Sequence, residues 1–246
     1  MQQPWPVINL KQVDSTNNYA RMLIENNELA DETVINALFQ QKGRGQQHNS
    51  WESEPGKNLT FTLVLFTKYL KAEKQFFLSQ AVSLAITNFL KSQEIKAQIK
   101  WPNDIYAGDS KIAGILIENS VLNESLIYSL TGIGLNVNQQ LFGPKLTNVQ
   151  SMKNLTSRDY DLNELLNQLL LCLDKQIERL KRNEFLQLKN DYLPQLYKFE
   201  KRDQFSANGT TFFGKIIDVD ESGQLVILND KGKKLEFMFK EVQFVD

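Results

Sequence analysis

The stretch Ile99–Glu118 reads IKWPNDIYAGDSKIAGILIE, and it decides how the middle of the chain folds. Pro102 lacks the N–H that a strand ladder needs and restricts the residue before it, so a short strand has to end there. Turn-forming residues follow at 103–104 and at 108–109, and the apolar run Ile112–Ile117 comes after the second turn. The pattern therefore predicts a hairpin.

Two residues of this hairpin suggest a ligand site. Lys111 stands at the mouth of the second strand, and Gly114 leaves a notch without a side chain, where a ligand can lie against the backbone. The alternative is an ordinary surface hairpin with a solvated lysine. A single motif does not separate these two interpretations.

The composition excludes several classes of protein. The chain has 246 residues, of which 41% are hydrophobic and 23% charged, and its net charge of −1 argues against a broad nucleic-acid-binding surface. One cysteine, Cys172, excludes an intramolecular disulfide framework, and one histidine, His48, excludes a histidine-rich zinc site. No apolar run approaches the ~20 residues of a membrane span, and the N-terminus shows no export signal, so we expect a cytoplasmic protein.

Hydrophobic periodicity predicts an α+β fold, in which helices flank one mixed sheet. The expected elements are a helix that follows caps at Asp14–Asn18 and ends near Asn27, strands at Thr33–Phe39, Asn58–Phe66 and Ser125–Asn136, a helix from about Glu73 to Ser92, a long helix capped by Asp161, and a helix from about Glu184. A loop rich in glycine and polar residues spans Gln40–Lys57, and residues 138–160 look irregular. Cys172 lies beside the apolar stripe of the long helix, which favours a buried structural thiol.

From Phe199 the pattern changes to short strands, which are separated by turns at 208–209, 221–223 and 230–232. A unit of this length has the size of a small β-barrel. We therefore expect two domains, residues 1–198 and residues 199–246.

Five motifs occur in one order along the chain: Ser15-Thr16-Asn17, then Lys42-Gly43-Arg44-Gly45 followed by Trp51, then Lys100-Trp101-Pro102-Asn103-Asp104, then KIAGILIE at 111–118, then Gly132-Ile133-Gly134-Leu135-Asn136. In this order they resemble the biotin–protein ligase family over roughly residues 10 to 140. The resemblance implies that 1–198 is a catalytic domain like that of class II aminoacyl-tRNA synthetases, with a mixed or antiparallel sheet, and that 199–246 is a small SH3-like β-barrel.

The resemblance also implies a reaction. The protein would join biotin to ATP as biotinyl-5′-adenylate and pass the biotinyl group to a lysine of a biotin carboxyl carrier domain of a carboxylase. Two anions must meet in the first step, so the site needs a cation and backbone amides aimed at the reacting oxygens. Lys111 and Arg44 are the expected catalytic residues. Mg²⁺ is the expected metal, with Asp104 as its candidate ligand.

Carried over position by position, the resemblance assigns ligand contacts. Biotin contacts are expected from Ser15, Thr16, Asn17, Gln40, Gly43, Arg44, Lys111 and Gly114, and ATP or adenylate contacts from Arg44, Gly45, Trp51, Asn103, Asp104, Lys111, Leu135 and Asn136. The family spacing to the Gly-Arg-Gly sequence selects Gln40 rather than the glutamine after it. From the residues alone, helix capping explains Ser15 and Thr16 equally well. Trp51 is equally consistent with a core anchor, and Asn136 with a strand-end turn.

The loop after Gly45 departs from the family pattern. Many members carry arginines and a further glycine where this chain reads Gln46-Gln47-His48-Asn49-Ser50. Arginine pairs with phosphate bidentately and glutamine does not. We therefore expect the loop to hold the adenylate less tightly, or to depend more on Lys111 and Arg44. We expect His48 to be a solvated side chain outside the site.

Two other functions remain open. A lipoate–protein ligase shares the superfamily and the adenylate chemistry, although the 100–104 sequence and the C-terminal β unit argue against it. The other is a catalytically silent binding or regulatory protein on the same scaffold, and the presence of Lys111 and Arg44 counts against that. We expect no N-terminal DNA-binding module and neither nucleic acid nor membrane as a partner. An exposed sheet edge leaves a homodimer possible.

Overall fold

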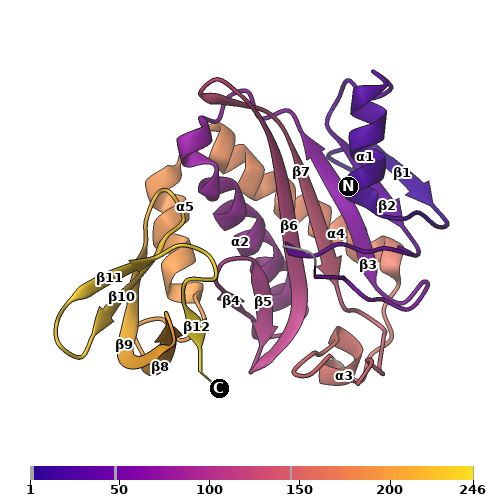
Figure 1. Ribbon diagram of the computed structural model, residues 1–246. Coiled ribbons are helices and arrows are strands. Elements are labelled where there is room, and N and C mark those ends of the chain that lie inside the picture. Colours follow the sequence, from indigo (N-terminus) through magenta and orange to yellow (C-terminus); the bar gives the residue numbers. More distant parts are fainter. Residues whose placement is uncertain (1–2, 47–48, 145, 246) are drawn as a thin grey trace.

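The structure is a computed structural model that describes residues 3–46, 49–144 and 146–245. It contains a larger sheet built from β1 to β7 and a smaller one built from β8 to β12 (Figure 1). The strands are β1 (Val7–Leu10), β2 (Thr33–Ala37), β3 (Leu59–Leu65), β4 (Gln98–Lys100), β5 (Asp104–Ala107), β6 (Ser110–Leu122), β7 (Ser125–Leu135), β8 (Arg202–Ala207), β9 (Thr210–Val219), β10 (Leu225–Asn229), β11 (Lys234–Phe237) and β12 (Gln243–Phe244). The helices are α1 (Thr16–Glu25), α2 (Phe76–Ser92), α3 (Met152–Thr156), α4 (Leu162–Lys181) and α5 (Phe185–Tyr192), with short 3₁₀ turns η2 (Ala72–Lys74) and η3 (Leu193–Gln195).

The larger sheet has the strand order β1-β2-β3-β7-β6-β5-β4. β1 runs parallel to β2, and the other neighbouring pairs are antiparallel, which confirms the predicted mixed sheet. The predicted hairpin is corrected, because the strand before Pro102 (β4) does not pair with the strand of the apolar run (β6). The unpredicted strand β5 lies between them and pairs with both. The prediction missed β1, because a four-residue strand beside Pro4 and Pro6 carries too short an alternation to be recognised.

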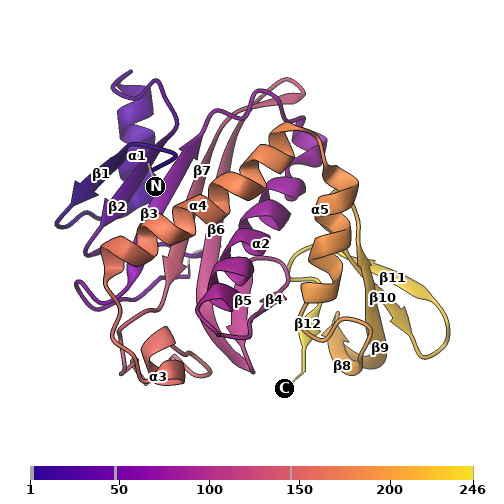
Figure 2. The same cartoon turned by 180° about the vertical axis from the view of Figure 1, so that it is seen from behind.

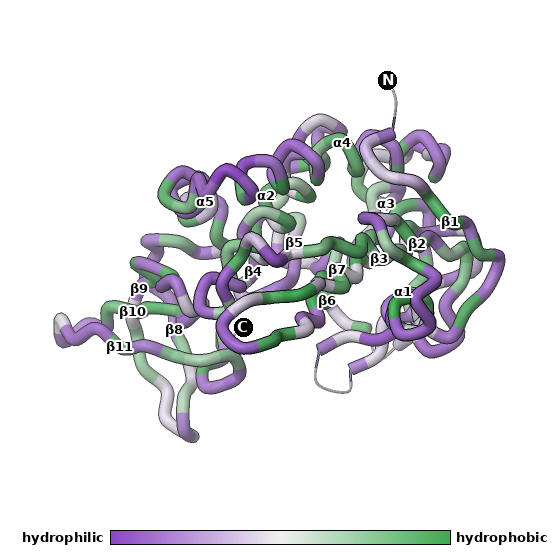
Figure 3. Tube along the Cα trace, turned by 90° about the horizontal axis from the view of Figure 1, so that it is seen from above, coloured by the Kyte–Doolittle hydropathy of each residue, from purple (hydrophilic) through white to green (hydrophobic). Residues whose placement is uncertain are grey.

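The two faces of the larger sheet carry different helices. α2 and α4 cover the back face (Figure 2), whereas α1 lies on the front face, where it contacts β2, β3 and β7 (Figure 1). α2 is buried on most sides, because it packs against α4 and α5 as well as the sheet. In Figure 3 the central strands are mainly green, whereas the outer turns and loops are mainly purple. The larger buried cluster contains the buried residues of α2 and α4, so most of the apolar core lies behind the sheet.

The long helix begins where its cap predicts. The Asp161 carboxylate accepts hydrogen bonds from the N–H groups of Asn163 (2.8 Å) and Glu164 (3.0 Å). Cys172 is partly buried beside the apolar stripe of α4, and burial raises the pKa of its thiol. This agrees with the predicted structural thiol. The region 138–160, predicted to be irregular, contains the short helix α3.

The C-terminal strands form an antiparallel sheet in the order β11-β10-β9-β8-β12. The predicted barrel is corrected in one respect, since the sheet stays open and its edge strands β11 and β12 do not pair within the described ranges. The predicted turns separate its strands. Phe205 and Ile216 belong to the same buried cluster as Leu78 of α2, so one core joins both sheets. The division at 198/199 stays a prediction.

Across the part of the chain that the structure describes, every helix is too short or too polar to span a membrane.

Candidate active site

A pocket of 260 Å³ opens on the front face of the larger sheet, beside the first turn of α1. The structure brings together there most of the residues that the sequence singled out. The predicted residues that line the pocket are Ser15, Thr16, Asn17, Gln40, Arg44, Gly45, Trp51, Asn103, Asp104, Lys111 and Gly114.

The floor of the pocket is a row of residues paired across five strands. Lys100 of β4 pairs with Asp104 of β5, Asp104 with Gly114 of β6, Gly114 with Gly134 of β7, and Gly134 with Thr60 of β3. Paired residues point to the same face of a sheet, so two glycines form the centre of this floor. A Cβ on Gly134 would lie 2.3 Å from the Trp51 ring, and one on Gly114 would lie 3.1 Å from it. The missing side chains therefore let the Trp51 ring lie against the strands.

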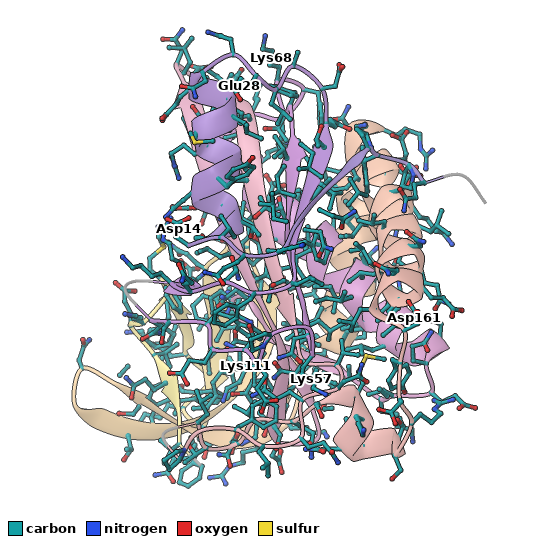
Figure 4. All side chains as sticks on the ribbon, turned by 90° about the vertical axis from the view of Figure 1, so that its right-hand side faces the viewer. Asp14, Glu28, Lys57, Lys68, Lys111 and Asp161 are labelled. Carbon is teal, nitrogen blue, oxygen red and sulfur yellow. The ribbon has the colours of Figure 1, made fainter. Side chains whose placement is uncertain are left out.

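A β-bulge places Lys111 on the same face as Gly114. Residues three apart on a regular strand point to opposite faces, but the pairing of β5 with β6 shifts by one residue between Ile105 and Tyr106, so Lys111 pairs with Tyr106. The Lys111 ammonium then lies 2.6 Å from Asp104 Oδ1. Figure 4 shows Lys111 in the lower half of the view, where the yellow C-terminal strands also lie.

Three polar residues open α1 at the opposite end of the pocket. Ser15, Thr16 and Asn17 are each at most 3% exposed. Ser15 occupies the N-cap position, but its side chain makes no capping hydrogen bond, so capping does not account for its hydroxyl. The N–H and the hydroxyl of Thr16 donate to Gln40 Oε1 (2.8 and 3.1 Å), and Thr62 of β3 donates to the Thr16 hydroxyl (2.8 Å). Gln40 therefore offers its Nε2 hydrogens to a ligand.

The glycine-rich loop folds back on itself as a small hairpin. The N–H of Gly45 donates to the carbonyl of Asn49 (2.7 Å), and the N–H of Trp51 donates to the carbonyl of Gly43 (2.9 Å). A Cβ on Gly43 would lie 2.3 Å from the Trp51 carbonyl oxygen. Gly43 thus lets the two arms of the loop approach each other, and it does not line the pocket.

Trp51 lies directly over the glycine floor. Its ring covers Gly134 and reaches Gly114, and the Lys111 ammonium is 5.7 Å from its ring centroid. The indole N–H is buried and has no hydrogen-bond partner within the described residues. A flat ring beside a cation is suited to stacking on a planar ligand, which is the role that the resemblance predicts.

Arg44 is held at the α1 end of the pocket by Glu118 of β6. Its guanidinium lies 2.8 Å from Glu118 Oε1 and donates to Asn18 Oδ1 at 2.8 Å. Glu118 also pairs with Arg21 (3.2 Å) and accepts a hydrogen bond from Asn17 Nδ2 (2.8 Å). The contact between Arg44 and a phosphate that the resemblance implies stays a prediction.

Two residues near the end of β7 lie outside the pocket wall. The Leu135 side chain is fully buried in the apolar core, so only its main chain can meet a ligand. Asn136 Nδ2 donates to the carbonyl of Gln150 (3.1 Å), whereas Asn136 Oδ1 is buried without a hydrogen-bond partner among the described residues. The adenine contact predicted for Asn136 stays a prediction. Gln47 and His48 lie outside the described residues.

The structure adds pocket residues that the predicted site left out. Lys100 and Trp101 come from β4 and the turn after it, and Phe239 comes from the segment after β11. The Trp101 indole donates to the carbonyl of Gly223 (2.9 Å), and its ring lies edge-on to Phe239, with centroids 6.2 Å apart. Lys100 is the first residue of the 100–104 motif, so the sequence alone could have identified it. Phe239 carries no local signal, because its position depends on how the two sheets meet.

The residues present do not form a resident metal site. Asp104 is the carboxylate in the pocket wall, and it is already paired with Lys111. No group of three or more His, Cys, Asp or Glu side chains that could hold a metal occurs in the ranges that the structure describes. Mg²⁺ commonly binds through one or two carboxylates together with substrate phosphates. The donor set fits an ion that arrives with a triphosphate.

The mixed sheet and the pocket over its glycine floor agree with the family resemblance of the sequence motifs. The Biotin/lipoate A/B protein ligase family matches residues 10–136, which contain every pocket-lining residue of the described chain except Phe239. The chain belongs to this family.

Individual relatives extend the match over most of the chain. The Bifunctional ligase/repressor BirA of Bacillus spizizenii is 29% identical over 229 residues, which cover 90% of this chain and 69% of that protein. The Biotin--[acetyl-CoA-carboxylase] ligase of Paracoccus denitrificans is 25% identical over 232 residues, which cover 92% and 95%. A structure of the biotin protein ligase from Aquifex aeolicus in complex with biotin and ATP gives a TM-score of 0.82 at 27% identity, and covers 98% of this chain and 99% of that chain.

Proposed function

We propose that the protein is an ATP-dependent biotin–protein ligase, which makes biotinyl-5′-adenylate and transfers the biotinyl group to a lysine of a carrier domain. The order of groups along the pocket supports this most. A polar end at Thr16 and Gln40 is followed by a floor without side chains and then by the Lys111 cation. Biotin has three parts in the same order, which are a polar ureido ring, an apolar chain and a carboxylate.

The polar end complements the ureido group, which presents one acceptor and two donors. The Ser15 hydroxyl and Gln40 Nε2 can donate to the ureido oxygen. The Thr16 hydroxyl oxygen has a lone pair for a ureido N–H, since its own hydrogen is directed to Gln40. The Ser15 side chain is buried and makes no capping hydrogen bond, so a ligand that left its hydroxyl unpaired would bind weakly.

In the first reaction a carboxylate oxygen of biotin attacks the α-phosphorus of ATP. An O–P bond forms, the bond from the α-phosphorus to the bridging oxygen breaks, and pyrophosphate leaves with the electron pair. Lys111 offsets the repulsion between the two anions and stabilises the charge that develops between them. Asp104 holds the Lys111 ammonium over the floor at 2.6 Å, and Trp51 stacks on the adenine.

In the second reaction the neutral amine of a carrier lysine attacks the acyl carbon of the adenylate. An amide bond forms, the bond from the acyl carbon to the phosphate oxygen breaks, and AMP leaves with the electron pair. The proton of the amine passes to solvent. The enzyme forms no covalent intermediate, because the adenylate is already activated.

Mg²⁺ belongs to this proposal as a companion of ATP. When bound, it neutralises part of the charge on the phosphates. Asp104 is the residue that we propose for it, because this carboxylate lies in the pocket wall next to Lys111.

Lipoate is the second candidate acid, because the description of the family includes lipoate ligases. The dithiolane ring of lipoate has no N–H and no carbonyl group. It would leave the polar groups of Ser15 and Gln40 without partners, and a site built to hydrogen-bond its substrate rejects an analogue that lacks those groups. The pocket therefore favours biotin.

The proposal includes a protein substrate, a cellular location and an oligomeric state. We propose a biotin carboxyl carrier domain of a carboxylase as the protein substrate and the cytoplasm as the location, since the single cysteine suits a reducing compartment. The net charge of −1 supports the absence of a nucleic acid partner, and a gel shift at low salt with site-specific duplex binding would refute that. Light scattering decides between a monomer and the possible homodimer.

Mass spectrometry of the small-molecule products tests the proposal without a carrier. The purified protein is incubated with ATP, Mg²⁺ and equal concentrations of biotin and lipoate. We expect biotinyl-adenylate as the main product, and we expect Gln40→Leu to lower the yield from biotin more than the yield from lipoate. Lipoyl-adenylate as the main product would identify a lipoate ligase, and the absence of both would indicate a silent scaffold.

A further inference from the structure

Among the described residues three cationic side chains line the pocket, and two of them have acidic partners. Arg44 is paired with Glu118 at 2.8 Å, and Lys111 is paired with Asp104 at 2.6 Å. The third is Lys100, and no ion pair joins it to a carboxylate within the described residues. Its charge is therefore the one in the pocket that no ion pair among the described residues offsets.

Aromatic rings take the place of an acidic partner around Lys100. Its ammonium lies 4.5 Å from the ring centroid of Tyr106, 5.2 Å from that of Phe244 and 5.7 Å from that of Tyr197. It also donates to the Tyr106 hydroxyl at 3.3 Å. The face of an aromatic ring attracts a cation but carries no net charge. The rings thus hold the ammonium in place without forming an ion pair with it.

The rings that hold Lys100 come from both sheets. Tyr106 belongs to β5 and Phe244 to β12, whereas Tyr197 lies just before the C-terminal strands. The Tyr197 hydroxyl donates to Asp109 Oδ1 at 2.6 Å, which fixes the orientation of that ring. A cation held from several sides is preorganised for a ligand.

The position of Lys100 fits the far end of a nucleotide. It stands at the end of the floor row, beyond Asp104 and two strands away from Gly114. Paired residues on adjacent strands lie about 5 Å apart, so Lys100 is roughly 10 Å from Gly114 on the side opposite α1. With the biotin carboxylate and the α-phosphate at Lys111, the leaving group of an in-line attack points away from biotin and toward Lys100.

We propose that Lys100 binds the β- and γ-phosphates of ATP and the pyrophosphate that they become. The inference rests on the proposed function. As the bond between the α-phosphorus and the bridging oxygen breaks, the electron pair moves onto pyrophosphate, and the Lys100 ammonium stabilises that added charge. Lys111 acts at the bond that forms, and Lys100 acts at the bond that breaks. The transfer of the biotinyl group to the carrier involves no pyrophosphate and does not use Lys100.

Separate assays of adenylate formation and of biotinyl transfer distinguish this role of Lys100 from a purely structural one. Lys100→Met keeps the apolar stem and removes the charge, and Lys100→Arg keeps the charge. For Lys100→Met we expect biotin-dependent ATP–pyrophosphate exchange to fall about a hundredfold and the KM for pyrophosphate to rise about tenfold. We expect transfer from preformed biotinyl-adenylate to a carrier to stay within about twofold of the wild type. Lys100→Arg should restore exchange to within about fivefold.

Lys198→Met is the matched control. Lys198 also lies over the Tyr197 ring, at 5.3 Å, but it is paired with Asp203 at 2.5 Å and does not line the pocket. Its loss should leave both half-reactions unchanged. Equal losses of exchange and of transfer in Lys100→Met, or an unchanged KM for pyrophosphate, would show that Lys100 only joins the two sheets.

Calorimetric titration with pyrophosphate makes the test independent of catalysis. The wild type should bind pyrophosphate about tenfold more tightly than Lys100→Met, whichever acid the enzyme activates. Equal affinities would overturn the role of Lys100 even if biotinyl-adenylate is formed. If no adenylate forms but the two affinities for pyrophosphate differ as expected, the proposed function is refuted and the pyrophosphate site is supported.

Discussion

The two faces of β7 differ although they are built from consecutive residues. Gly132 and Gly134 point to the front, where a Cβ would meet Asn17 and Trp51 at 2.6 and 2.3 Å. Ile133 and Leu135 alternate with them and are buried in the core behind the sheet. Successive side chains of the strand point to opposite faces, so those on the front face the pocket and those on the back face the core. Changes on the front should impair the reaction, and changes on the back should impair folding.

The largest effect is expected at the front, from Lys111→Met. Removal of a preorganised cation should lower the rate of biotinyl-adenylate formation about a hundredfold to a thousandfold. The melting temperature should change little, because the lost ion pair with Asp104 is partly exposed. Single-turnover kinetics of adenylate formation measure the rate. Lys198→Met removes an ion pair of similar length and exposure outside the pocket, and a comparable loss in that control would contradict the prediction.

The next effect is expected at the back, from Leu135→Ala. This side chain is fully buried, so its truncation should lower the free energy of unfolding by about 3 kcal/mol. The kcat/KM for biotin and for ATP should stay the same per folded molecule, because only the main chain of Leu135 can reach a ligand. Urea unfolding and steady-state kinetics measure the two quantities. A selective rise in the KM for ATP with unchanged stability would show instead that this side chain reaches the nucleotide.

A smaller loss of activity is expected from Gly134→Ala. The new Cβ would overlap the Trp51 ring, so the ring must move and the slot above the floor must narrow. We expect kcat/KM for biotin to fall about thirtyfold, which corresponds to about 2 kcal/mol. Gly143→Ala is the control, since its Cβ would meet Glu52 Oε2 at an ordinary 3.6 Å. Equal activity of the two variants would show that the floor does not contact biotin.

The smallest effect is expected from Gln46→Arg in the loop that departs from the family pattern. Gln46 lines the pocket, and its Oε1 is buried without a hydrogen-bond partner among the described residues. A hydrogen bond from a charged donor to phosphate exceeds one from glutamine by about 1 to 1.5 kcal/mol, so dissociation of the adenylate should slow about tenfold. A filter-binding chase measures that rate. No change would mean that position 46 does not restrain the adenylate.

Periodicity and turn chemistry predicted most of the elements. The apolar stripes of α2 and α4, the Asp161 cap and the turns between the C-terminal strands all carry local signals. The four-residue strand β1 and the five-residue helix α3 are too short for a periodic signal. The open C-terminal sheet was also missed, because closure depends on the edge strands β11 and β12 meeting in space.

The site was predictable where it consists of motifs and unpredictable where it depends on register. Lys111 and Gly114 were placed in one site from the hairpin pattern and then from the resemblance, although residues three apart on a regular strand face opposite sides. The bulge opposite Tyr106 places both residues on the same face of the sheet. No pattern in the local sequence predicts this bulge. The partner of Arg44 was missed for a similar reason, since Glu118 meets it only after the loop has folded.

The central claim is that Lys111, over a floor without side chains, joins the biotin carboxylate to ATP for transfer to a carrier. The most direct measurement is the intact mass of a purified biotin carboxyl carrier domain after incubation with the protein, ATP, and biotin and lipoate together. We predict an increment of one biotinyl group with the wild type and with Lys198→Met, and none in the same time with Lys111→Met. A lipoyl increment, or an equal biotinyl increment with Lys111→Met, would contradict the account.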